Sequence, residues 1–558
     1  MAFQIPTPFL LLLSAALQNI AIANIAPEQP LLRSRGSFAG FALLNFLLFA
    51  LYRVFIYPNF TSPLRHLPTP KGAHPIFGHV ASQFSIPRGG DYLRFTKEIH
   101  NDGLIRLKGF LNADQVLLTS TKALAEVLVS KSYEFTKPER SRNYLRQNIG
   151  DGLVVAEGDP HKRQRKHSLP SFGFRQIKGL YPLFWEKAVK MTRKIEEYSF
   201  DQSQATGIAD LDYWAPKAAL DIIGVAGLGR DFNTLENSGD RIVHLYEELT
   251  RISPESTRHA MLFIILGETA ASLLMPYTSK RLRDTTRELR CLSEEFVRRK
   301  RDQIKNPDSK SVDTLALLMK GDVFSDQELV DQLLTIIAAG NPARSVNNVD
   351  SHETTSSAFT WLTYLLTLHP DIQARLRAEI HEALPLDWSE NPTADLAARL
   401  ECLPLLNGVC NEALRVYPTV PLTSRVSKVD NTVLGQHIRA GTRLFIVPWA
   451  VNNDPAIWGA DVAEFKPERW IDRKTGSPNQ HGGADTNYAV LTFLHGPRSC
   501  IGQGFAKAEL RCLVAAFVGA FEFEMADKTE EVVPAGIITT KPRNGLKLRL
   551  RKARNLDD

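Results

Sequence analysis

The chain has 558 residues, a hydrophobic content of 44% and a net charge of +6. This length suits one very large domain or several smaller ones, and the composition is ordinary for a globular protein. No dense Lys/Arg tract interleaved with aromatic residues occurs, so nucleic-acid binding is not indicated. The cysteines form no C-x-x-C pair, so neither a zinc site nor a disulfide framework is indicated, and a reducing, cytosol-facing location fits. They are Cys291, Cys402, Cys410, Cys500 and Cys512.

Two apolar segments open the chain and are candidates for a membrane anchor. Residues 8–26 carry no charge, and residues 38–57 are broken only by Asn45 and Arg53. Each segment approaches the roughly 20 residues that cross a bilayer. The second is the better anchor, because Arg53 and Arg65 follow its apolar part and the positive-inside bias then places the rest of the chain in the cytosol. The first segment is either a second transmembrane helix or a cleaved signal peptide, although no basic region precedes it.

Four prolines in residues 58–72 indicate a stiff, extended hinge between the anchor (1–57) and a folded domain (73–558). In this domain helical periodicity dominates, which predicts a mainly α fold with a minor β-sheet. Amphipathic helices are predicted over residues 121–130, 180–197, 279–305 and 370–384. Short strands are predicted over residues 104–107, 115–118 and 443–447.

A basic cluster, His-Lys-Arg-Gln-Arg-Lys-His, occupies residues 161–167. Most runs of this kind form the solvated face of a helix. Arg163 and Lys166 are also candidates for attracting an acidic redox partner.

A long apolar helix is predicted to start at a capping box in residues 325–328. Its pattern reaches Gly340, is interrupted by residues 341–351, and resumes at His352. Pro342 removes a backbone donor and costs about 3 kcal/mol in a helix interior. The asparagines of the interruption favour turns over helix. We therefore predict one helix that ends at the interruption and a second that begins near His352.

The stretch Phe-Leu-His-Gly-Pro-Arg-Ser-Cys-Ile-Gly at residues 493–502 places Cys500 in a turn before an apolar run. Its glycines can adopt positive φ and let the backbone approach a flat partner. Amides directed at the sulfur, and the start of the next helix, would stabilise a thiolate. Such a thiolate can be an axial haem ligand, whereas a lone cysteine would more simply be a buried structural residue. The spacing F-x-x-G-x-R-x-C-x-G resembles the haem-binding loop of the cytochrome P450 superfamily, the haem-thiolate monooxygenases.

This resemblance implies a cytochrome P450 fold with an N-terminal transmembrane anchor, and haem b as the cofactor. It implies that Cys500 is the axial iron ligand, that Arg498 binds a haem propionate and that Phe493 packs near the sulfur. Gly496 and Gly502 are the glycines of the haem-binding loop.

Three further residues are candidates for propionate binding by the same resemblance. Arg165 matches the arginine of a W-x-x-x-R motif, and His161 stands where the motif has tryptophan. We keep His161 as a candidate because imidazole can also donate a hydrogen bond. Arg425 matches a position that binds the second propionate in the family. The alternative is that Arg425 is a surface arginine at the start of a strand.

The pattern A-G-x-[DE]-T-[TS] of the family is matched when the interruption is left out. Glu353 and Thr354 then form the acid–alcohol pair, in which a hydroxyl and a carboxylate relay protons. The alternative is a Ser/Thr-rich helix start. Since the family places this point against the haem, we hypothesise that residues 341–351 are a retained intron fragment or a misplaced splice site rather than a functional insertion.

Glu412 and Arg415 form an E-x-x-R pattern, whose spacing puts both charges on one helix face. The pattern alone is common. Its position before Arg469 and Cys500 resembles the family's buried Glu–Arg–Arg network beneath the haem. Buried charges of this kind persist only when they are paired and fully hydrogen-bonded.

The resemblance as a whole implies a microsomal, fungal-type monooxygenase that acts on an apolar small molecule, in fungal secondary metabolism. The expected location is the endoplasmic reticulum membrane, with the catalytic domain in contact with lipid and facing the cytosol. Electrons would come from NADPH through a separate NADPH–cytochrome P450 reductase, with cytochrome b5 as a second candidate donor, because the chain carries no G-x-G-x-x-G fingerprint. The alternatives are a haem-thiolate isomerase or dehydratase that does not use O2, and an inactive haem protein.

Overall fold

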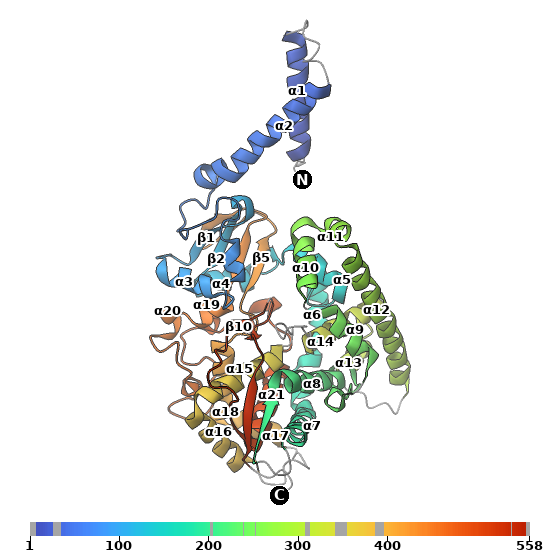
Figure 1. The fold of residues 1–558 in the computed structure, drawn as a ribbon, viewed down its shortest axis with the longest axis vertical. Coiled ribbons are helices and arrows are strands. Elements are labelled where there is room, and N and C mark those ends of the chain that lie inside the picture. The colour runs from blue at the N-terminus through green and yellow to red at the C-terminus, as the bar shows by residue number, and fades with distance from the viewer. Residues whose placement is uncertain are drawn as a thin grey trace.

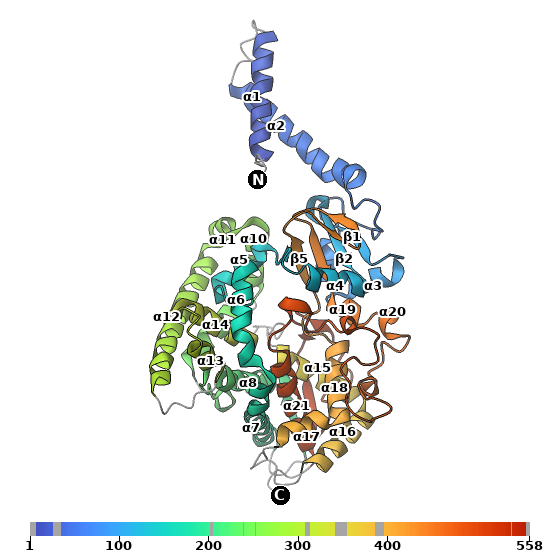
Figure 2. The same ribbon diagram turned by 180° about the vertical axis from the view of Figure 1, so that it is seen from behind.

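The structure of the chain is a computed structural model. It describes residues 7–25, 35–200, 205–237, 239–250, 253–306, 313–340, 354–384, 395–536 and 538–553. Two views of the ribbon show two long helices standing apart from a larger body (Figures 1 and 2). The part of the body nearest to these helices contains the larger sheet, and helices form most of the rest (Figure 1).

Helices dominate the described residues, as the periodicity predicts. Their bounds are α1 Thr7–Ile25, α2 Arg35–Leu51, α3 Gly90–Glu98, α4 Thr121–Ala125, α5 Glu139–Ile149, α6 Gly158–Ser168, α7 Phe174–Ser199, α8 Leu211–Ile223, α9 Arg241–Thr250, α10 Pro254–Leu266, α11 Glu268–Leu274, α12 Pro276–Lys305, α13 Thr314–Lys320, α14 Asp326–Gly340, α15 Thr354–Leu368, α16 Pro370–Ala383, α17 Leu396–Cys402, α18 Pro404–Val416, α19 Pro448–Asn452, α20 Pro455–Trp458 and α21 Gln503–Ala520.

The strands are short. Within the described residues they form a five-stranded sheet, a three-stranded sheet and two two-stranded sheets. Their bounds are β1 Leu104–Lys108, β2 Asp114–Leu118, β3 Phe135–Thr136, β4 Thr206–Asp210, β5 Thr423–Ser427, β6 Asn431–Val433, β7 Gln436–Ile438, β8 Arg443–Ile446, β9 Phe521–Met525, β10 Pro534–Ala535, β11 Lys541–Pro542 and β12 Lys547–Lys552.

The five-stranded sheet has the order β1-β2-β8-β5-β3 and joins segments that are far apart in the sequence. Strand β2 pairs with β8 in parallel, with Val116 opposite Leu444, and all the other pairs are antiparallel. The antiparallel pairing of β5 with β8 places Arg425 opposite Leu444, inside the sheet. The sheet therefore holds Arg425 on a central strand.

The core is organised around α21, which is apolar on nearly all sides and is therefore buried among other helices. It packs against α7, α15, α16 and α18. At the α7 contact the rings of Phe184 and Phe505 lie edge to face, with centroids 4.8 Å apart. Since Cys500 directly precedes α21, this packing fixes the position of the cysteine loop.

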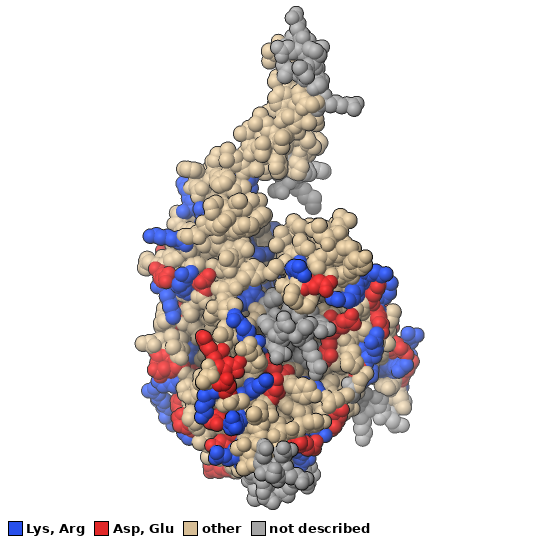
Figure 3. All heavy atoms as spheres, viewed as in Figure 1, with Lys and Arg blue, Asp and Glu red and all other residues tan. Residues whose placement is uncertain are grey.

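The two N-terminal helices differ from the rest in being almost entirely exposed. Segments Pro8–Ile25 and Gly36–Thr61 are each long and apolar enough to cross a membrane. The second continues from α2 into a π-helical segment, Tyr52–Thr61. On the face of the molecule shown in Figure 3, the upper part formed by these helices is largely free of charged side chains, whereas both signs of charge are spread over the body.

Most predicted elements are present, with small changes in their bounds. The predicted helices over residues 180–197, 279–305 and 370–384 correspond to α7, α12 and α16, and the predicted strands correspond to β1, β2 and β8. The segment 121–130 is α4 followed by a π-helical turn, Glu126–Ser130, so it is not one regular α-helix. The predicted capping box is formed, because the Glu328 amide donates to Ser325 Oγ and the Ser325 amide donates to the Glu328 carboxylate.

The predicted break in the long helix remains a prediction. Helix α14 is described as far as Gly340 and α15 from Thr354, so the predicted end and restart fall between these two residues. The interruption 341–351 and Glu353 lie outside the described residues.

Candidate active site

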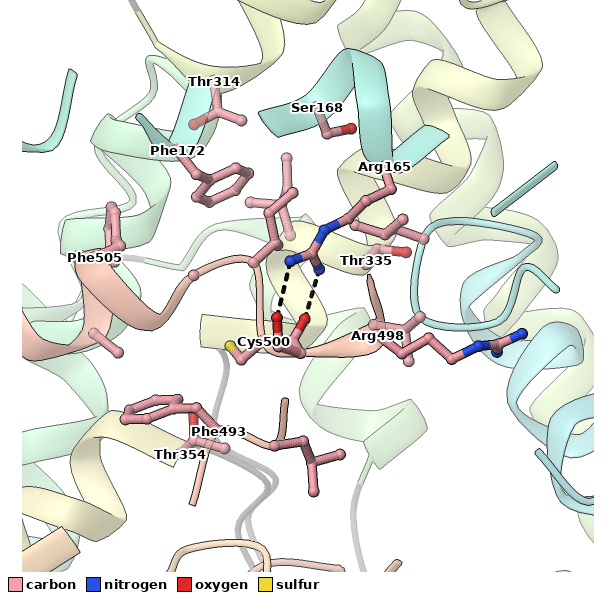
Figure 4. A pocket seen from close by; sticks show the side chains of 18 of the residues that line it. Arg165, Ser168, Phe172, Thr314, Thr335, Thr354, Phe493, Arg498, Cys500 and Phe505 are labelled. Atoms are coloured by element: carbon pink, nitrogen blue, oxygen red, sulfur yellow. Dashed lines mark hydrogen bonds between the residues drawn. The ribbon is translucent and has the colours of Figure 1, made fainter. Parts of the chain in front are cut away.

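A cavity of about 350 Å³ lies between α6, α8, α13, α14, α15 and β5 on one side and the cysteine loop with α21 on the other. Part of its wall is apolar, including Leu153, Ile223, Leu318 and Ile336. Its wall also contains the predicted site residues His161, Arg165, Thr354, Arg425, Phe493, Arg498, Cys500 and Gly502. These predicted residues come from four separate parts of the sequence. Figure 4 shows Arg165, Thr354, Phe493, Arg498 and Cys500 around the cavity.

Cys500 is held in a closed loop between a 3₁₀ turn, Gly496–Arg498, and α21. Its amide donates a hydrogen bond to the Phe493 carbonyl oxygen at 2.9 Å, and the side chain lines the cavity near Phe493 (Figure 4). Burial raises the pKa of the Cys500 thiol, whereas the Gly502 amide and Arg165 lower it. The amide and the guanidinium both favour an anionic sulfur, which is the form that binds iron.

Different physical reasons account for the glycines at positions 496 and 502 of the cysteine loop. Gly496 has φ +76°, and a Cβ there would lie 2.1 Å from the Leu128 carbonyl oxygen, so packing against Leu128 requires glycine. Gly502 has φ −87°, so positive φ does not explain it. A Cβ at Gly502 would meet only Cys500 Sγ, at 4.0 Å. Gly502 therefore keeps the space beside the sulfur open.

Arg165 reaches the cysteine loop from α6. Its Nη1 donates to the Ser499 carbonyl oxygen at 2.5 Å and its Nη2 donates to Ser499 Oγ at 3.2 Å (Figure 4). The guanidinium therefore stands at the cavity wall beside Cys500 and ties two segments together that are 334 residues apart in sequence.

A second group of cations surrounds a single carboxylate, that of Glu157. Arg498 forms a buried ion pair with Glu157, yet none of its three guanidinium nitrogens has a hydrogen-bond partner among the described residues. Burial, and then the charge of Arg498, lower the pKa of Arg425 to about 10. Burial, and then the charge of Arg425, lower the pKa of Lys137 to about 7. Arg425 is buried, so the alternative that it is a surface arginine is wrong. Around Glu157, the buried cations outnumber the buried carboxylate.

His161 lies in the same region and is buried. Its Nδ1 is 3.2 Å from the Tyr133 hydroxyl. Burial, and then the charge of Arg498, lower the pKa of His161 to about 4, so the ring is neutral at pH 7. A neutral imidazole has one N–H donor, which limits it to one hydrogen bond to an anion.

These residues fit haem b. The propionates of haem are two anions. The Nε and Nη2 atoms of Arg498, which have no hydrogen-bond partner among the described residues, and the neighbouring buried cations offer the charge-assisted donors that carboxylates need. Burial raises the pKa of the Cys500 thiol on balance, and the Gly502 amide and Arg165 offset part of this effect; as a thiolate the sulfur is a soft donor suited to iron. An apolar wall completes the surroundings of a flat, mostly apolar macrocycle.

Thr354 is the first residue of α15, and it lines the cavity together with Thr355. Glu353, its predicted acidic partner, lies outside the described residues. Another carboxyl group is present, because Glu509 of α21 lines the same cavity and is hydrogen-bonded to the Thr355 side chain. Burial raises the pKa of Glu509 to about 8, so this carboxyl group holds a proton at pH 7.

Glu412, Arg415 and Arg469 are joined in one buried network. Arg415 and Glu412 are both 0% exposed, and Arg415 donates to both carboxylate oxygens, at 2.9 and 2.8 Å. Arg469 Nε donates to Glu412 Oε1 at 3.3 Å. Trp470 Nε1 donates to Glu412 Oε2 at 2.9 Å, and the Lys466 amide donates to Oε1 at 3.1 Å. Each oxygen of Glu412 thus has at least two donors.

We expect Glu412→Gln to lower the free energy of unfolding by about 3–5 kcal/mol, because it leaves the completely buried guanidinium of Arg415 without its counter-charge, whereas Arg469 keeps its ion pair with Asp461. The matched control is Glu468→Gln. Glu468 pairs with Arg375 at 2.8 Å, but the two side chains are 43% and 54% exposed, so about 0–1 kcal/mol is expected. Chemical denaturation measures the free energy of unfolding of both variants. Similar losses in the two variants would contradict a structural role for the network.

Three residues of this site were not predicted from the sequence: Lys137, Glu157 and Glu509. Glu509 carries a sequence signal, since it is an acidic residue between apolar positions of α21. Lys137 and Glu157 carry none, because their importance comes from segments that meet only in the fold.

Comparisons with known proteins agree with this geometry. The sequence model of the family described as Cytochrome P450 matches residues 68–548. The chain is 39% identical to cytochrome P450 monooxygenase sphH of Aspergillus fumigatus, over 89% of this chain and 90% of the relative. It is 38% identical to cytochrome P450 monooxygenase abl5 of Leptosphaeria maculans (90% of each chain) and 37% identical to cytochrome P450 monooxygenase ptmK of Penicillium ochrochloron (90% and 96%).

Among solved structures, the heme domain of cytochrome P450DA matches with a TM-score of 0.70 and 22% identity, over 88% of this chain and 98% of that one. This likeness shows the cytochrome P450 fold, which the cysteine motif predicted. Together with the family match and the fungal relatives, it leads to one conclusion: this chain belongs to the cytochrome P450 family and is an oxidoreductase of the monooxygenase class.

Proposed function

We propose that this chain is a membrane-bound haem-thiolate monooxygenase that inserts one oxygen atom of O2 into an apolar organic substrate. The observation that carries the proposal is the cavity in which Cys500 faces apolar side chains and lies beside buried cations. The three fungal relatives reported above are named monooxygenases, and this supports the reaction class and a role in fungal secondary metabolism.

In this proposal the cofactor is haem b, which supplies the iron centre for O2 activation when it is bound. Cys500 is its axial ligand, and Phe493 packs beside the sulfur. Arg498 and Arg425, with Arg165 and His161 at the same wall, hold the propionates. The apolar side chains of the cavity exclude water and bind the substrate by burial of apolar surface.

Protons reach the site, we infer, through side chains of α15 and α21. Thr354 holds a hydroxyl at the cavity wall, with Glu353 as its acidic partner. Glu509 holds a proton on its carboxyl group at pH 7, and the Thr355 hydroxyl, to which it is hydrogen-bonded, also lines the cavity. Thr355 can therefore pass the Glu509 proton to the cavity.

We expect Glu509→Gln to lower the turnover rate by a factor of about a hundred, because glutamine keeps the shape but cannot release a proton. In the unchanged enzyme the rate should fall as the pH rises through about 8, where Glu509 loses its proton, and the variant should lack this fall. Rates measured across pH test both points.

Thermal unfolding gives a second measurement for the same variant. A carboxyl group whose pKa rises from 4.5 in the unfolded chain to about 8 in the folded one stabilises the fold below 4.5 and loses this effect as the pH rises to 8. The Tm of the unchanged enzyme should therefore fall over this range more than that of Glu509→Gln. Parallel pH curves of Tm, or a variant with unchanged turnover, would contradict the role of Glu509.

The electron donor in this proposal is NADPH–cytochrome P450 reductase, with cytochrome b5 as a second donor. Of the two cations predicted to attract an acidic partner, Arg163 is engaged within the fold, because it pairs with Glu328 and donates to the Val323 carbonyl oxygen at 3.2 Å. Lys166 is exposed on α6 and remains the candidate.

The test of the function uses the full-length haem-containing enzyme with purified reductase. We expect a substrate-induced spin shift with an apolar probe such as 7-ethoxycoumarin, and probe oxidation that requires NADPH, reductase and O2. Conversion of substrate without NADPH or reductase would instead support the isomerase or dehydratase. A haem-loaded protein without a spin shift for a broad panel of apolar compounds would support the inactive haem protein.

The proposed location is the endoplasmic reticulum membrane, with residues 1–57 as the anchor, residues 58–72 as the hinge and residues 73–558 as the catalytic domain in the cytosol. Two apolar helices support the anchor. The body also carries exposed apolar side chains on α10 and α11, including Ile265 and Leu273, at the end where α1 and α2 emerge (Figure 1). These side chains suit contact with lipid.

A further inference from the structure

The helices α1 and α2 are in contact and cross each other at an angle (Figures 1 and 2). Ala15 of α1 is completely buried, whereas Leu12, Leu13 and Leu17 nearby on the same helix are exposed. A small residue at a helix contact lets two backbones approach closely, as is typical of helix pairs in membranes. The contact is therefore specific to one face of α1.

Two polar side chains meet at this contact and form hydrogen bonds with each other. Gln18 Nε2 donates to Asn45 Oδ1 at 3.2 Å, and Asn45 Nδ2 donates to Gln18 Oε1 at 3.0 Å. Asn45 Nδ2 also approaches the Leu11 carbonyl oxygen at 3.4 Å, and Asn45 is only 9% exposed. Both amides lie well inside apolar helices, where an unpaired amide in lipid would be costly.

The contacts also give the direction of the helices. Leu11 meets Asn45, and Asn19 Nδ2 donates to Ser37 Oγ at 3.2 Å. Position therefore increases along α1 as it decreases along α2, which is the order of an antiparallel pair. Segment 8–25 contains no charged residue, and segment 36–52 contains none either. At 1.5 Å per residue each covers most of the roughly 30 Å of hydrocarbon.

We propose that α1 and α2 cross the membrane together as a helical hairpin locked by the Gln18–Asn45 amide pair. The N-terminus then lies on the same side of the membrane as the catalytic domain. This proposal rests on the membrane location given above, but it does not depend on which side the catalytic domain faces. It excludes both a cleaved signal peptide and a single crossing by α2.

Sealed microsomes that contain the full-length enzyme, with one epitope at each terminus, test the topology. We expect external protease to remove both epitopes together. A protected N-terminal epitope with an accessible C-terminal one, or the absence of the N-terminal epitope from the mature protein, would overturn the hairpin. Protection of both epitopes would keep the hairpin and refute the cytosolic orientation, so the two proposals fail separately.

A second reporter distinguishes a hairpin that crosses the membrane from one that lies on its surface. Gly36→Cys is introduced at the exposed start of α2, with the exposed Cys291 and Cys402 replaced by serine. We expect a membrane-impermeant maleimide to label position 36 only after detergent is added. Labelling in intact microsomes in which external protease also removes both epitopes would overturn the crossing.

The amide pair is tested by Gln18→Leu, Asn45→Leu and their combination. Each single variant removes one partner of the Gln18–Asn45 pair and leaves the other amide without it, so we expect an increased fraction of chains with a protected N-terminus. The double variant removes both amides. Its increase in the fraction of chains with a protected N-terminus should therefore be smaller than the sum of the increases in the two single variants. Asn24→Leu is the matched control, because Asn24 is an exposed amide on the same helix. An effect of Asn24→Leu equal to that of Gln18→Leu would contradict the lock.

Discussion

Replacing Cys500 with alanine is expected to abolish the thiolate-type Soret band of the reduced CO complex. Cys500 is the only cysteine on the cavity wall as far as the structure describes the chain, and both the Gly502 amide and Arg165 favour its anionic form. Alanine removes the sulfur but keeps the backbone bond from residue 500 to the Phe493 carbonyl oxygen. The loop should therefore keep its shape, and the spectrum reports the ligand directly.

The other four cysteines provide controls within the same chain. Cys291 and Cys402 are exposed, whereas Cys410 and Cys512 are buried in the core away from the cavity wall, and burial raises the pKa of both buried thiols. Alanine variants at these positions should keep the band. If Cys500→Ala does not accumulate, Cys500→Ser gives the same spectroscopic test. A thiolate-type band in either Cys500 variant would show that the axial ligand is wrongly assigned.

The fold was most predictable where the signals are local. The capping box at Ser325 and Glu328 and the proline at the first turn of α16 each mark a helix start within a few residues, and the structure has both. The π-helical turn that follows α4 was not predictable, because it has no such local signal.

The candidate site was predictable only in part, for a physical reason. The cysteine loop is one short stretch, so its spacing is visible in the sequence. The cation group is different, because Lys137, Glu157 and Arg425 meet only through the packing of three distant segments. Their pKa shifts arise from burial and from each other's charge, and neither can be read from sequence spacing.

The Glu412 network shows the same division. The i,i+3 spacing predicted that Glu412 and Arg415 share a helix face, which the structure has. The completion of the network by Trp470 Nε1 and by the carbonyl oxygens of Asn452 and Val462 depends on loops that fold back onto α18. A common sequence pattern thus acquires its meaning from tertiary partners.

The largest gain in function is expected from removing residues 341–351. Helix α14 ends at Gly340 and α15 begins at Thr354, and both helices contribute side chains to the cavity wall, Thr335 from α14 and Thr354 from α15. We therefore expect the extra residues to disturb the site of the proposed haem. The deleted form joins Gly340 to His352, which restores a continuous apolar pattern from α14 into α15 with Glu353 and Thr354 in sequence.

The expected size of this effect follows from the polar groups of the interruption. Placing one such group against the haem without a partner costs roughly 1–3 kcal/mol. Since about 1.4 kcal/mol corresponds to a factor of ten, haem affinity should rise by a factor of about 5 to 150 for each such group in the deleted form. Coupled NADPH turnover should rise with it. Haem content per protein and the ratio of product to NADPH consumed measure the two effects.

A third form separates the length of the interruption from its sequence. In this form residues 341–351 are replaced by eleven Gly and Ser residues, so the length is kept while Pro342 and the asparagines are lost. If the added length causes the defect, this form should behave like the full chain; if the particular side chains cause it, this form should load haem better. Sequencing of the transcript tests the origin of the segment independently. If the full-length chain equals the deleted form in haem content and in coupled turnover, the segment is a genuine insertion, and Glu353 and Thr354 must then reach the site by another path of the chain.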